Sequence, residues 1–96
     1  MAHELVWLED AVAQFQEAYD DLEGLEAGLG DEFVLSLEQL QERIREHPLM
    51  YQLVGPRARR GLTSRFSYGL FYFVEDERVV VVSLLHTARS TEHWPG

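Results

Sequence analysis

Hydrophobic residues recur at helical spacing in the first half of the chain. After Glu9 they stand at positions i, i+4, i+7 and i+11, with acids and glutamines between them: Ala11, Phe15, Ala18 and Leu22, flanked by Val12 and Tyr19. This pattern predicts an amphipathic helix of about four turns. The acids Glu9 and Asp10 in its first turn suit the positive end of the helix dipole.

A glycine-rich break separates this helix from a second one. Gly24, Gly28 and Gly30 interrupt the pattern, and Asp31 is predicted to cap the next helix. Apolar positions then repeat the same spacing until Pro48 ends the helix, at Phe33, Leu37, Leu40 and Ile44. Two amphipathic helices joined by a short turn predict an antiparallel helical hairpin.

Shorter strand patterns flank the hairpin. Residues 3–8 are rich in strand-favouring types and predict an N-terminal strand. Residues 49–56 have no clear period and predict a loop, whereas 57–62, with three Arg, predict a possible strand with one exposed face.

Two further strands are predicted near the end of the chain. Residues 65–74 alternate, so that one face holds Phe66, Tyr68, Leu70, Tyr72 and Val74. A polar turn at 75–77 leads to an almost continuous apolar run at 78–86. Such a pair predicts a β-hairpin that is buried on part of both faces.

The order of these elements predicts an α+β fold, in which residues 1–96 form a single domain. The N-terminal strand and two or three antiparallel strands form one small sheet, and the helical hairpin packs on one face. The first strand must join this sheet, because an isolated strand leaves its backbone groups unpaired. The sequence does not indicate which strand it lies beside.

Charge is divided unequally between the two halves of the chain. Of 96 residues, 17 are acidic and eight are basic, all of them Arg, which gives a net charge of −9 at pH 7. Residues 1–42 hold 12 of the acids and no Lys or Arg, whereas residues 43–96 have a net charge of +3. No apolar run suggests a membrane span, and the first residues lack the basic region of a signal peptide, so a cytoplasmic protein is expected.

Several short motifs in the second half stand in a characteristic order. They are Arg65-Phe66-Ser67-Tyr68 followed by Tyr72, the apolar run into His86-Thr87-Ala88-Arg89, and Trp94. Gly28-Leu29-Gly30 with Phe33, and Arg43-Ile44 with His47-Pro48, add to the pattern. Together they resemble the RelE/ParE superfamily of toxins from bacterial toxin–antitoxin pairs. The likeness covers nearly the whole chain and is closer to the ParE-like branch, often labelled plasmid stabilisation proteins.

This resemblance implies a protein that is harmful when free and is held inactive by a cognate antitoxin. In the family, the antitoxin's tail wraps the sheet and the hairpin. ParE-like members act on DNA gyrase without a known hydrolytic step, whereas RelE-like members cut messenger RNA in the ribosomal A site. DNA gyrase is therefore the expected target, with the ribosome and messenger RNA as the alternative. A diverged, non-toxic antitoxin-binding module stays open, as do a homodimer and a toxin–antitoxin hetero-oligomer.

The chemistry of RNA cleavage helps to choose between these targets. Metal-free cleavage needs a proton acceptor, cations that stabilise charge on phosphorus and an acid for the leaving oxygen. RelE-like toxins have an Arg directly after the strand tyrosine, where this chain has Gly69. A second Arg in the family corresponds to Ala88 or, after a one-residue slip, to Arg89. This incomplete set favours a non-enzymatic protein; an enzyme here would be a metal-independent mRNA endoribonuclease.

Four residues remain as candidate catalytic groups: Arg65, His86, Arg89 and His93. For His86 the commoner alternative is a hydrogen-bonded residue that fixes the tail. Arg89 has the alternative of an ion pair with Glu92 or with an acid on a helix. Six residues lie between the two histidines and no third ligand is evident, so neither a metal nor another cofactor is expected.

A basic cluster and an aromatic stripe are candidate binding surfaces. Arg57, Arg59 and Arg60, with Arg65 nearby, suit phosphate or an acidic antitoxin segment, although they could instead pair with the acidic hairpin of the same chain. Tyr68 and Trp94 are further candidates for target or antitoxin binding. The stripe from Phe66 to Phe73 is expected to be core, and any apolar face left bare to be covered by the antitoxin or a second copy. A net charge of −9 repels RNA, which favours a protein target.

Overall fold

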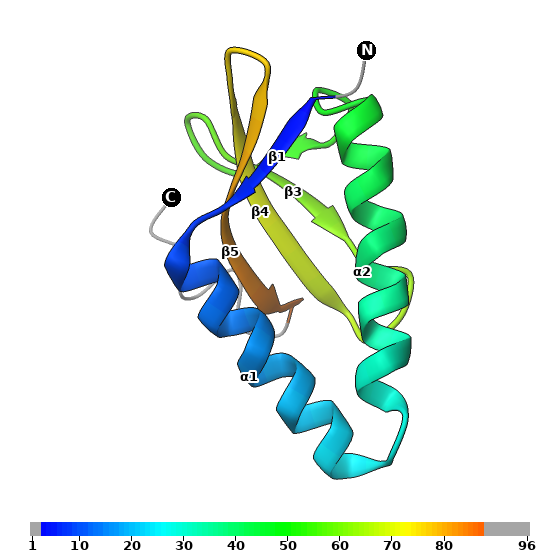
Figure 1. The fold of residues 1–96 in the computed structure, drawn as a ribbon. Coiled ribbons are helices and arrows are strands. Elements are labelled where there is room, and N and C mark those ends of the chain that lie inside the picture. Colours follow the sequence, from blue (N-terminus) through cyan, green and yellow to red (C-terminus); the bar gives the residue numbers. More distant parts are fainter. Residues whose placement is uncertain (1–2, 88–96) are drawn as a thin grey trace.

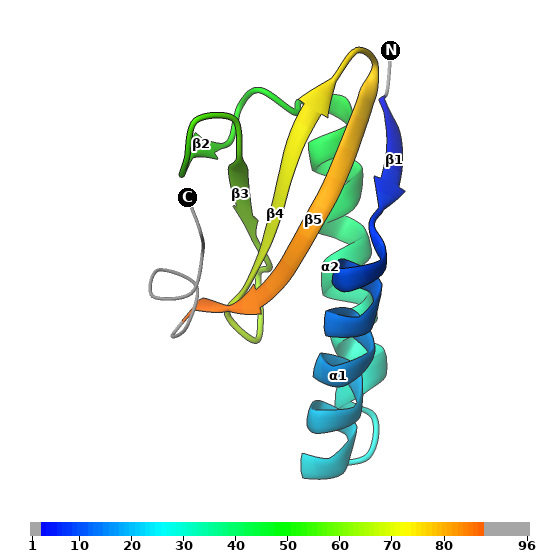
Figure 2. The same ribbon diagram turned by 90° about the vertical axis from the view of Figure 1, so that its left-hand side faces the viewer.

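The structure, a computed structural model, describes residues 3–87 as a sheet with two helices packed on it (Figure 1). The elements are β1 (Glu4–Trp7), α1 (Glu9–Leu25), α2 (Leu29–Glu46), β2 (Gln52–Leu53), β3 (Arg59–Leu62), β4 (Tyr68–Glu75) and β5 (Arg78–His86). Figure 2 shows that both helices lie on the same side of the sheet. The predicted α+β fold is confirmed, and the strand at 78–86 has the predicted bounds.

The sheet is larger and more mixed than predicted. Within the described residues it has five strands in the order β1-β5-β4-β3-β2. β1 pairs in parallel with β5, and the other neighbours are antiparallel. The additional strand, β2, lies in the 49–56 segment that was predicted to be a loop, and its two residues are too few to produce a recognisable alternation.

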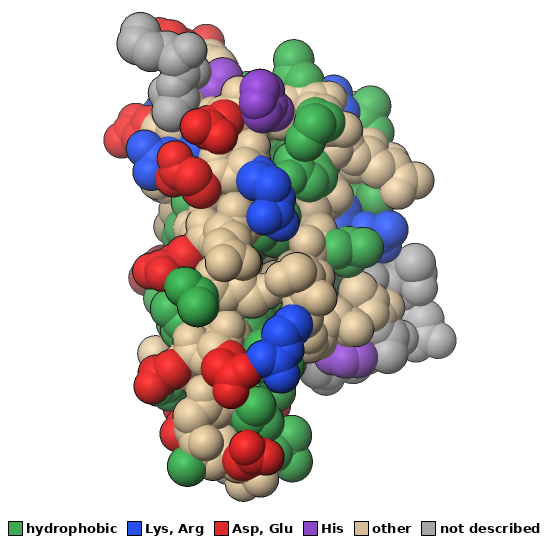
Figure 3. All heavy atoms as spheres, turned by 90° about the vertical axis from the view of Figure 1, so that its right-hand side faces the viewer, with side chains coloured by type: hydrophobic (Ala, Val, Ile, Leu, Met, Phe, Trp, Pro, Cys, Tyr) green, Lys and Arg blue, Asp and Glu red, His purple; other side chains and the backbone are tan. Residues whose placement is uncertain are grey.

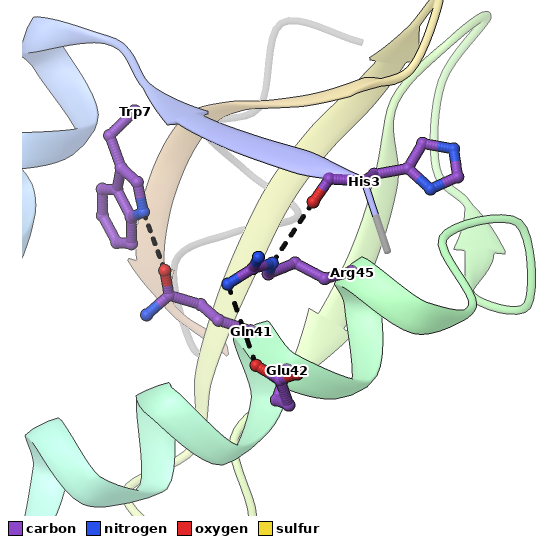
Figure 4. Close-up of polar contacts among 5 residues, drawn as sticks. All are labelled: His3, Trp7, Gln41, Glu42 and Arg45. Carbon is purple, nitrogen blue, oxygen red and sulfur yellow. Dashed lines mark hydrogen bonds and ion pairs between the residues drawn. The ribbon is translucent and has the colours of Figure 1, made fainter. Parts of the chain in front are cut away.

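Polar contacts with α2 hold β1 at its edge of the sheet (Figure 4). The Trp7 indole donates a hydrogen bond of 3.0 Å to the Gln41 side chain. The Arg45 guanidinium donates one of 3.2 Å to the His3 carbonyl, and the His3 amide donates to the Arg45 carbonyl at 3.0 Å. The N-terminal strand is therefore bound on one side by β5 and on the other by the end of α2.

The turn between the helices differs from the prediction that Asp31 is the cap. Gly28 is the N-cap of α2, with a left-handed φ of 96° that favours glycine. The Glu23 carboxylate accepts hydrogen bonds from the amides of Gly28 and Gly30, at 3.0 and 2.8 Å, and so satisfies the first donors of the helix. Asp31 instead accepts a hydrogen bond from the Tyr19 hydroxyl, which raises the pKa of Tyr19.

The core lies between α2 and the sheet. The four apolar positions predicted on the second helix, Phe33, Leu37, Leu40 and Ile44, are all buried, and so are Tyr68, Leu70 and Tyr72 on the predicted inner face of β4. α2 approaches β3 closely at Gly61, where a Cβ atom would lie 2.9 Å from Leu40. On α1, only Ala11 and Ala18 are fully buried, and Val12 is 49% exposed.

The strand predicted from Arg65 begins only at Tyr68. Phe66 and Ser67 have φ values of 73° and 54°, which take the backbone out of the extended conformation. Similarly, the strand predicted at 57–62 begins at Arg59. Among the described residues, no helix is long and apolar enough to cross a membrane.

Candidate functional site

A tight turn before β4 sets the position of the residues at one end of the sheet. The Thr63 hydroxyl donates a hydrogen bond of 2.5 Å to the Arg65 carbonyl and accepts one of 3.2 Å from the Tyr68 amide. The Thr63 amide also donates to the Tyr68 carbonyl at 3.0 Å. These bonds turn Tyr68 inward, where its ring centroid lies 4.9 Å from that of Phe33.

His86 ends β5 directly opposite Tyr68. The two residues are partners in the β4–β5 pairing, and their rings meet edge to face with centroids 5.3 Å apart. The next amide, of Thr87, donates a hydrogen bond of 2.8 Å to the Ser67 carbonyl. His86 therefore lies on the helix-covered face of the sheet, at the end where β4 begins.

Beside this pair lies a partly enclosed cavity of about 320 Å³ between α1 and the sheet. Its lining comes from one face of α1 and from the end of the β4–β5 hairpin: Gln14, Glu17, Ala18, Asp21, Tyr68, Leu84, Leu85 and His86. Glu17 and Asp21 are exposed and stand one helical turn apart. The described part of the lining contains two carboxylates and no Lys or Arg, so these residues contribute negative charge to the cavity.

A β-bulge shapes the wall of this cavity. Phe71 pairs with Ser83 and Tyr72 pairs with Val81, so that Val82 is an extra residue on β5. The Gln14 carboxamide oxygen accepts hydrogen bonds from the Leu84 amide at 2.9 Å and from the Ser83 hydroxyl at 3.1 Å. Gln14 therefore ties α1 to β5 where the regular pairing is interrupted.

Arg65 lies at the same end of the sheet but faces the other helix. Its guanidinium forms an ion pair with Glu32 of α2 and lies over the Phe66 ring, 4.7 Å from the centroid. The predicted alternative, an Arg paired with the acidic hairpin, thus describes this residue. Of the four candidate catalytic groups, the structure brings Arg65 and His86 to one end of the sheet. Arg89 and His93 lie outside the described residues, as does Trp94.

The structure divides the predicted basic cluster between different surroundings. Arg57 lies over the Phe73 ring, 4.5 Å from the centroid, and 3.9 Å from the Glu75 carboxylate. Arg59 donates a hydrogen bond of 2.7 Å to the Tyr51 carbonyl. Because neighbouring residues on a strand point to opposite faces, Arg60 lies on the other side of the sheet from Arg59. The three side chains therefore form no continuous patch on one face.

The sheet face away from the helices is also less bare than predicted. Phe71 is only 1% exposed, and Phe73 lies under Arg57. A Cβ atom at Gly69 would meet the Arg60 side chain at 3.2 Å and the Phe71 ring at 3.3 Å. The aliphatic part of Arg60 therefore occupies the space beside Gly69, and Phe71 is a core residue, as predicted for the aromatic stripe.

Tyr72 is a core residue rather than a site residue. It is completely buried, and its hydroxyl donates a hydrogen bond of 2.6 Å to the Pro48 carbonyl. Burial raises the pKa of this phenol well above its ordinary value. Among residues 3–87, no group of three His, Cys, Asp or Glu side chains is arranged to hold a metal ion.

Three residues of the cavity were not singled out from the sequence: Gln14, Glu17 and Asp21. On α1 they accompany the buried Ala18 at helical spacing, and small residues at 11 and 18 let the helix approach β5 closely. This combination of small residues and acids on one helix face is the signal that could have identified them.

Comparison with known proteins finds similarity over most of the chain. Residues 5–91 match the family described as the ParE toxin of the type II toxin–antitoxin system parDE. No curated protein matches the chain.

Several solved structures share this fold. The chromosomal ParDE TA system from P. aeruginosa is similar with a TM-score of 0.77 and 13% identity, over 88% of this chain and 96% of that one. A mutant of the E. coli toxin RelE in the free state gives a TM-score of 0.66 and 22% identity, over 95% and 90% of the two chains. The intact E. coli RelBE toxin–antitoxin complex gives 0.58 and 22%, over 88% and 95%. At these identities the likeness establishes the fold.

Proposed function

The chain belongs to the ParE toxin family of type II toxin–antitoxin systems, and we propose that it inhibits DNA gyrase by binding to it and is neutralised by a cognate antitoxin. Such a target places its action in the cytoplasm. The antitoxin partnership is supported by the structural relatives, which include the ParDE system and the RelBE complex.

The observation that carries the choice of a protein target is the acidic cavity beside His86 and Tyr68. Its described lining holds Glu17 and Asp21 and no Lys or Arg. RNA phosphates are repelled by such a surface, whereas nucleases that act without a metal need cations at the scissile phosphate. Arg65, in the turn before β4, forms an ion pair with Glu32 of α2, a helix that does not contribute to the described lining of the cavity.

One observation favours RelE-like cleavage of messenger RNA as the alternative. Arg65 and His86 lie at the same end of the sheet, where β4 begins and β5 ends. If Arg89 and His93 joined them, the four candidate groups would form a metal-independent catalytic set. The absence of an Arg at Gly69 weighs against this alternative.

Induced expression in a bacterial host, followed by assays of DNA and RNA, distinguishes these functions. Gyrase inhibition gives cleaved DNA with an SOS response, and the purified chain blocks supercoiling by purified gyrase. Rapid translation arrest with cut messenger would contradict the proposal and support the nuclease. Normal growth would support a non-toxic antitoxin-binding module. Arg89→Ala is expected to abolish toxicity with the fold intact, and full toxicity of this variant would remove Arg89 from the site.

A further inference from the structure

We propose that the cavity between α1 and the end of the β4–β5 hairpin binds an arginine side chain of the cognate antitoxin. This inference rests on the antitoxin partnership proposed above and assigns a role to Glu17 and Asp21. The two carboxylates receive the guanidinium, and the remaining walls receive the aliphatic part of the side chain.

The two carboxylates of the cavity favour a cationic ligand. Within residues 3–87, the ion pairs join Arg45 with Glu42, Arg57 with Glu75 and Arg65 with Glu32. Glu17 and Asp21 thus have no cationic partner in this part of the chain, although they stand one turn apart and repel each other. A guest cation relieves that repulsion.

The shape and chemistry of the walls favour arginine over a small cation. A cavity of about 320 Å³ accommodates a long side chain. Ala18, Leu84 and Leu85 supply apolar surface for its methylene groups. A planar guanidinium presents five N–H donors in a rigid fork, so it can donate to both carboxylates in fixed directions, whereas an ammonium group is a compact point charge with three rotatable donors.

The cavity is held open by contacts within the chain. The hydrogen bonds from the Leu84 amide and the Ser83 hydroxyl to Gln14 fix α1 against β5. The packing of Tyr68 between Phe33 and His86 fixes the floor. A guest therefore meets a preformed site and loses little free energy to ordering it.

The surroundings favour the antitoxin as the source of the arginine. Acidic side chains spread along the helical side of the molecule (Figure 3), and the chain has a net charge of −9, so a cationic protein segment is attracted. The cavity is also lined by His86, a candidate catalytic group, and by the buried ring of Tyr68. An antitoxin side chain anchored in the cavity would cover His86.

The chemistry of the cavity is tested with a small probe. N-acetyl-arginine amide is titrated into the isotope-labelled chain, with the isosteric, uncharged N-acetyl-citrulline amide as the control. Chemical shifts of Ala18, Leu84 and Leu85 are expected to move with the arginine probe and not with the citrulline probe. They are expected to stay unchanged in Glu17→Gln/Asp21→Asn. Equal responses to both probes, or no response to either, would contradict the cation site.

The antitoxin is tested as the protein encoded in the reading frame beside the toxin's, by calorimetric titration. Glu17→Gln/Asp21→Asn is expected to weaken binding by about tenfold or more, because a guanidinium loses two charge-assisted hydrogen-bond partners. Asp20→Asn/Glu26→Gln makes the same change in net charge with exposed residues of α1 and its C-cap outside the cavity lining, and is expected to weaken binding by less than about twofold.

The outcomes separate this inference from the proposed function. If the two double variants weakened antitoxin binding equally, only the net charge of the chain would matter for binding. This result would overturn the inference. If Glu17→Gln/Asp21→Asn bound the antitoxin as tightly as wild type but inhibited gyrase less, the cavity would receive a cation of the target instead. This result would overturn the assignment to the antitoxin. If the wild-type chain bound no antitoxin, both would fail. If the wild-type chain bound the antitoxin but did not inhibit gyrase, the proposed function would fail and the inference would stand, because antitoxin binding is measured separately.

Discussion

The two ends of the β4–β5 hairpin use charge in opposite ways. At the end where the hairpin turns, Arg57 lies against Phe73 and Glu75, and Arg59 donates to the Tyr51 carbonyl. At the other end, Glu17 and Asp21 face a cavity whose described lining holds no Lys or Arg. Within residues 3–87, the basic residues therefore largely serve contacts within the chain, whereas Glu17 and Asp21 form no ion pair there. A cluster of charge in the sequence indicates a binding surface only when the fold leaves that charge without internal partners.

The largest expected effect comes from the aromatic packing behind the cavity. Phe33 is completely buried and contacts the rings of Phe15, Phe66 and Tyr68, at centroid distances of 4.9 to 6.1 Å. Phe33→Ala is expected to lower the free energy of unfolding by about 3–5 kcal/mol, measured by urea denaturation. Leu35→Ala, at a position 57% exposed on the same helix, serves as the control and should cost much less. Equal losses in the two variants would contradict the assigned core.

The next largest effect on stability is expected from Gln14, which connects α1 to the bulge in β5 by hydrogen bonds. Gln14→Ala removes the acceptor for the Leu84 amide and is expected to cost about 1–3 kcal/mol. Amide hydrogen exchange at Leu84 should accelerate more than exchange at Val79, at the opposite end of β5. Gln16→Ala, at an exposed position of α1, is the matched control. Unchanged exchange at Leu84 in the Gln14 variant would show that the bulge does not depend on this side chain.

In the middle of β4, Tyr72→Phe tests the buried hydrogen bond to Pro48. The variant leaves the Pro48 carbonyl without this donor, so a loss of about 1–2 kcal/mol in the free energy of unfolding is expected at pH 7. A loss within measurement error would mean that water or another donor replaces the phenol.

The same residue predicts a dependence on alkaline pH. Burial raises the pKa of Tyr72 in the folded chain above its value of about 10 in the unfolded chain. Its contribution to stability is therefore fully present below pH 10 and is lost as the pH rises further, since the unfolded state releases the proton more readily. Tyr72→Phe should flatten the fall in stability above pH 10; an equally steep fall would assign it to other groups, such as Tyr19.

The smallest effect is expected at Arg57. The ion pair with Glu75 is 3.9 Å long and largely exposed, so Arg57→Gln should change the free energy of unfolding by about 1 kcal/mol or less. Toxicity and neutralisation by the antitoxin, assayed by growth, should also be retained. Loss of either activity in a stable variant would show that this Arg serves a partner after all.

The sequence predicted the elements with strong periodicity well. The apolar positions of α2 and the inner face of β4 are buried as expected, because each repeats over several turns or residue pairs. It missed β2, whose two residues show no period, and the left-handed turn at Phe66 and Ser67, where neither residue is glycine. Gly28 rather than Asp31 caps α2, because Glu23 on the preceding helix satisfies the first amides.

The candidate site was harder to predict for a physical reason. Acids on α1 look like a solvated helix face, and only the packing of that helix against β5 places Glu17 and Asp21 around a cavity. Likewise, Arg59 and Arg60 are adjacent in sequence, but the alternation of β3 directs their side chains to opposite faces of the sheet. A motif within one strand predicts which residues lie close together in that strand. A site between a helix and a sheet depends on residues that are far apart in the sequence.

The parallel pairing of β1 with β5 also determines when the protein can fold during its synthesis. Glu4 pairs with Arg78, so the first strand made must wait for the last one before its backbone groups are satisfied (Figure 1). Pairings between such distant residues form slowly, and a chain emerging from the ribosome cannot complete this sheet until β5 has been translated. The cavity wall supplied by Leu84, Leu85 and His86 is made at the same late stage. Chains that end before β5 would therefore lack both the β1–β5 pairing and this wall of the cavity.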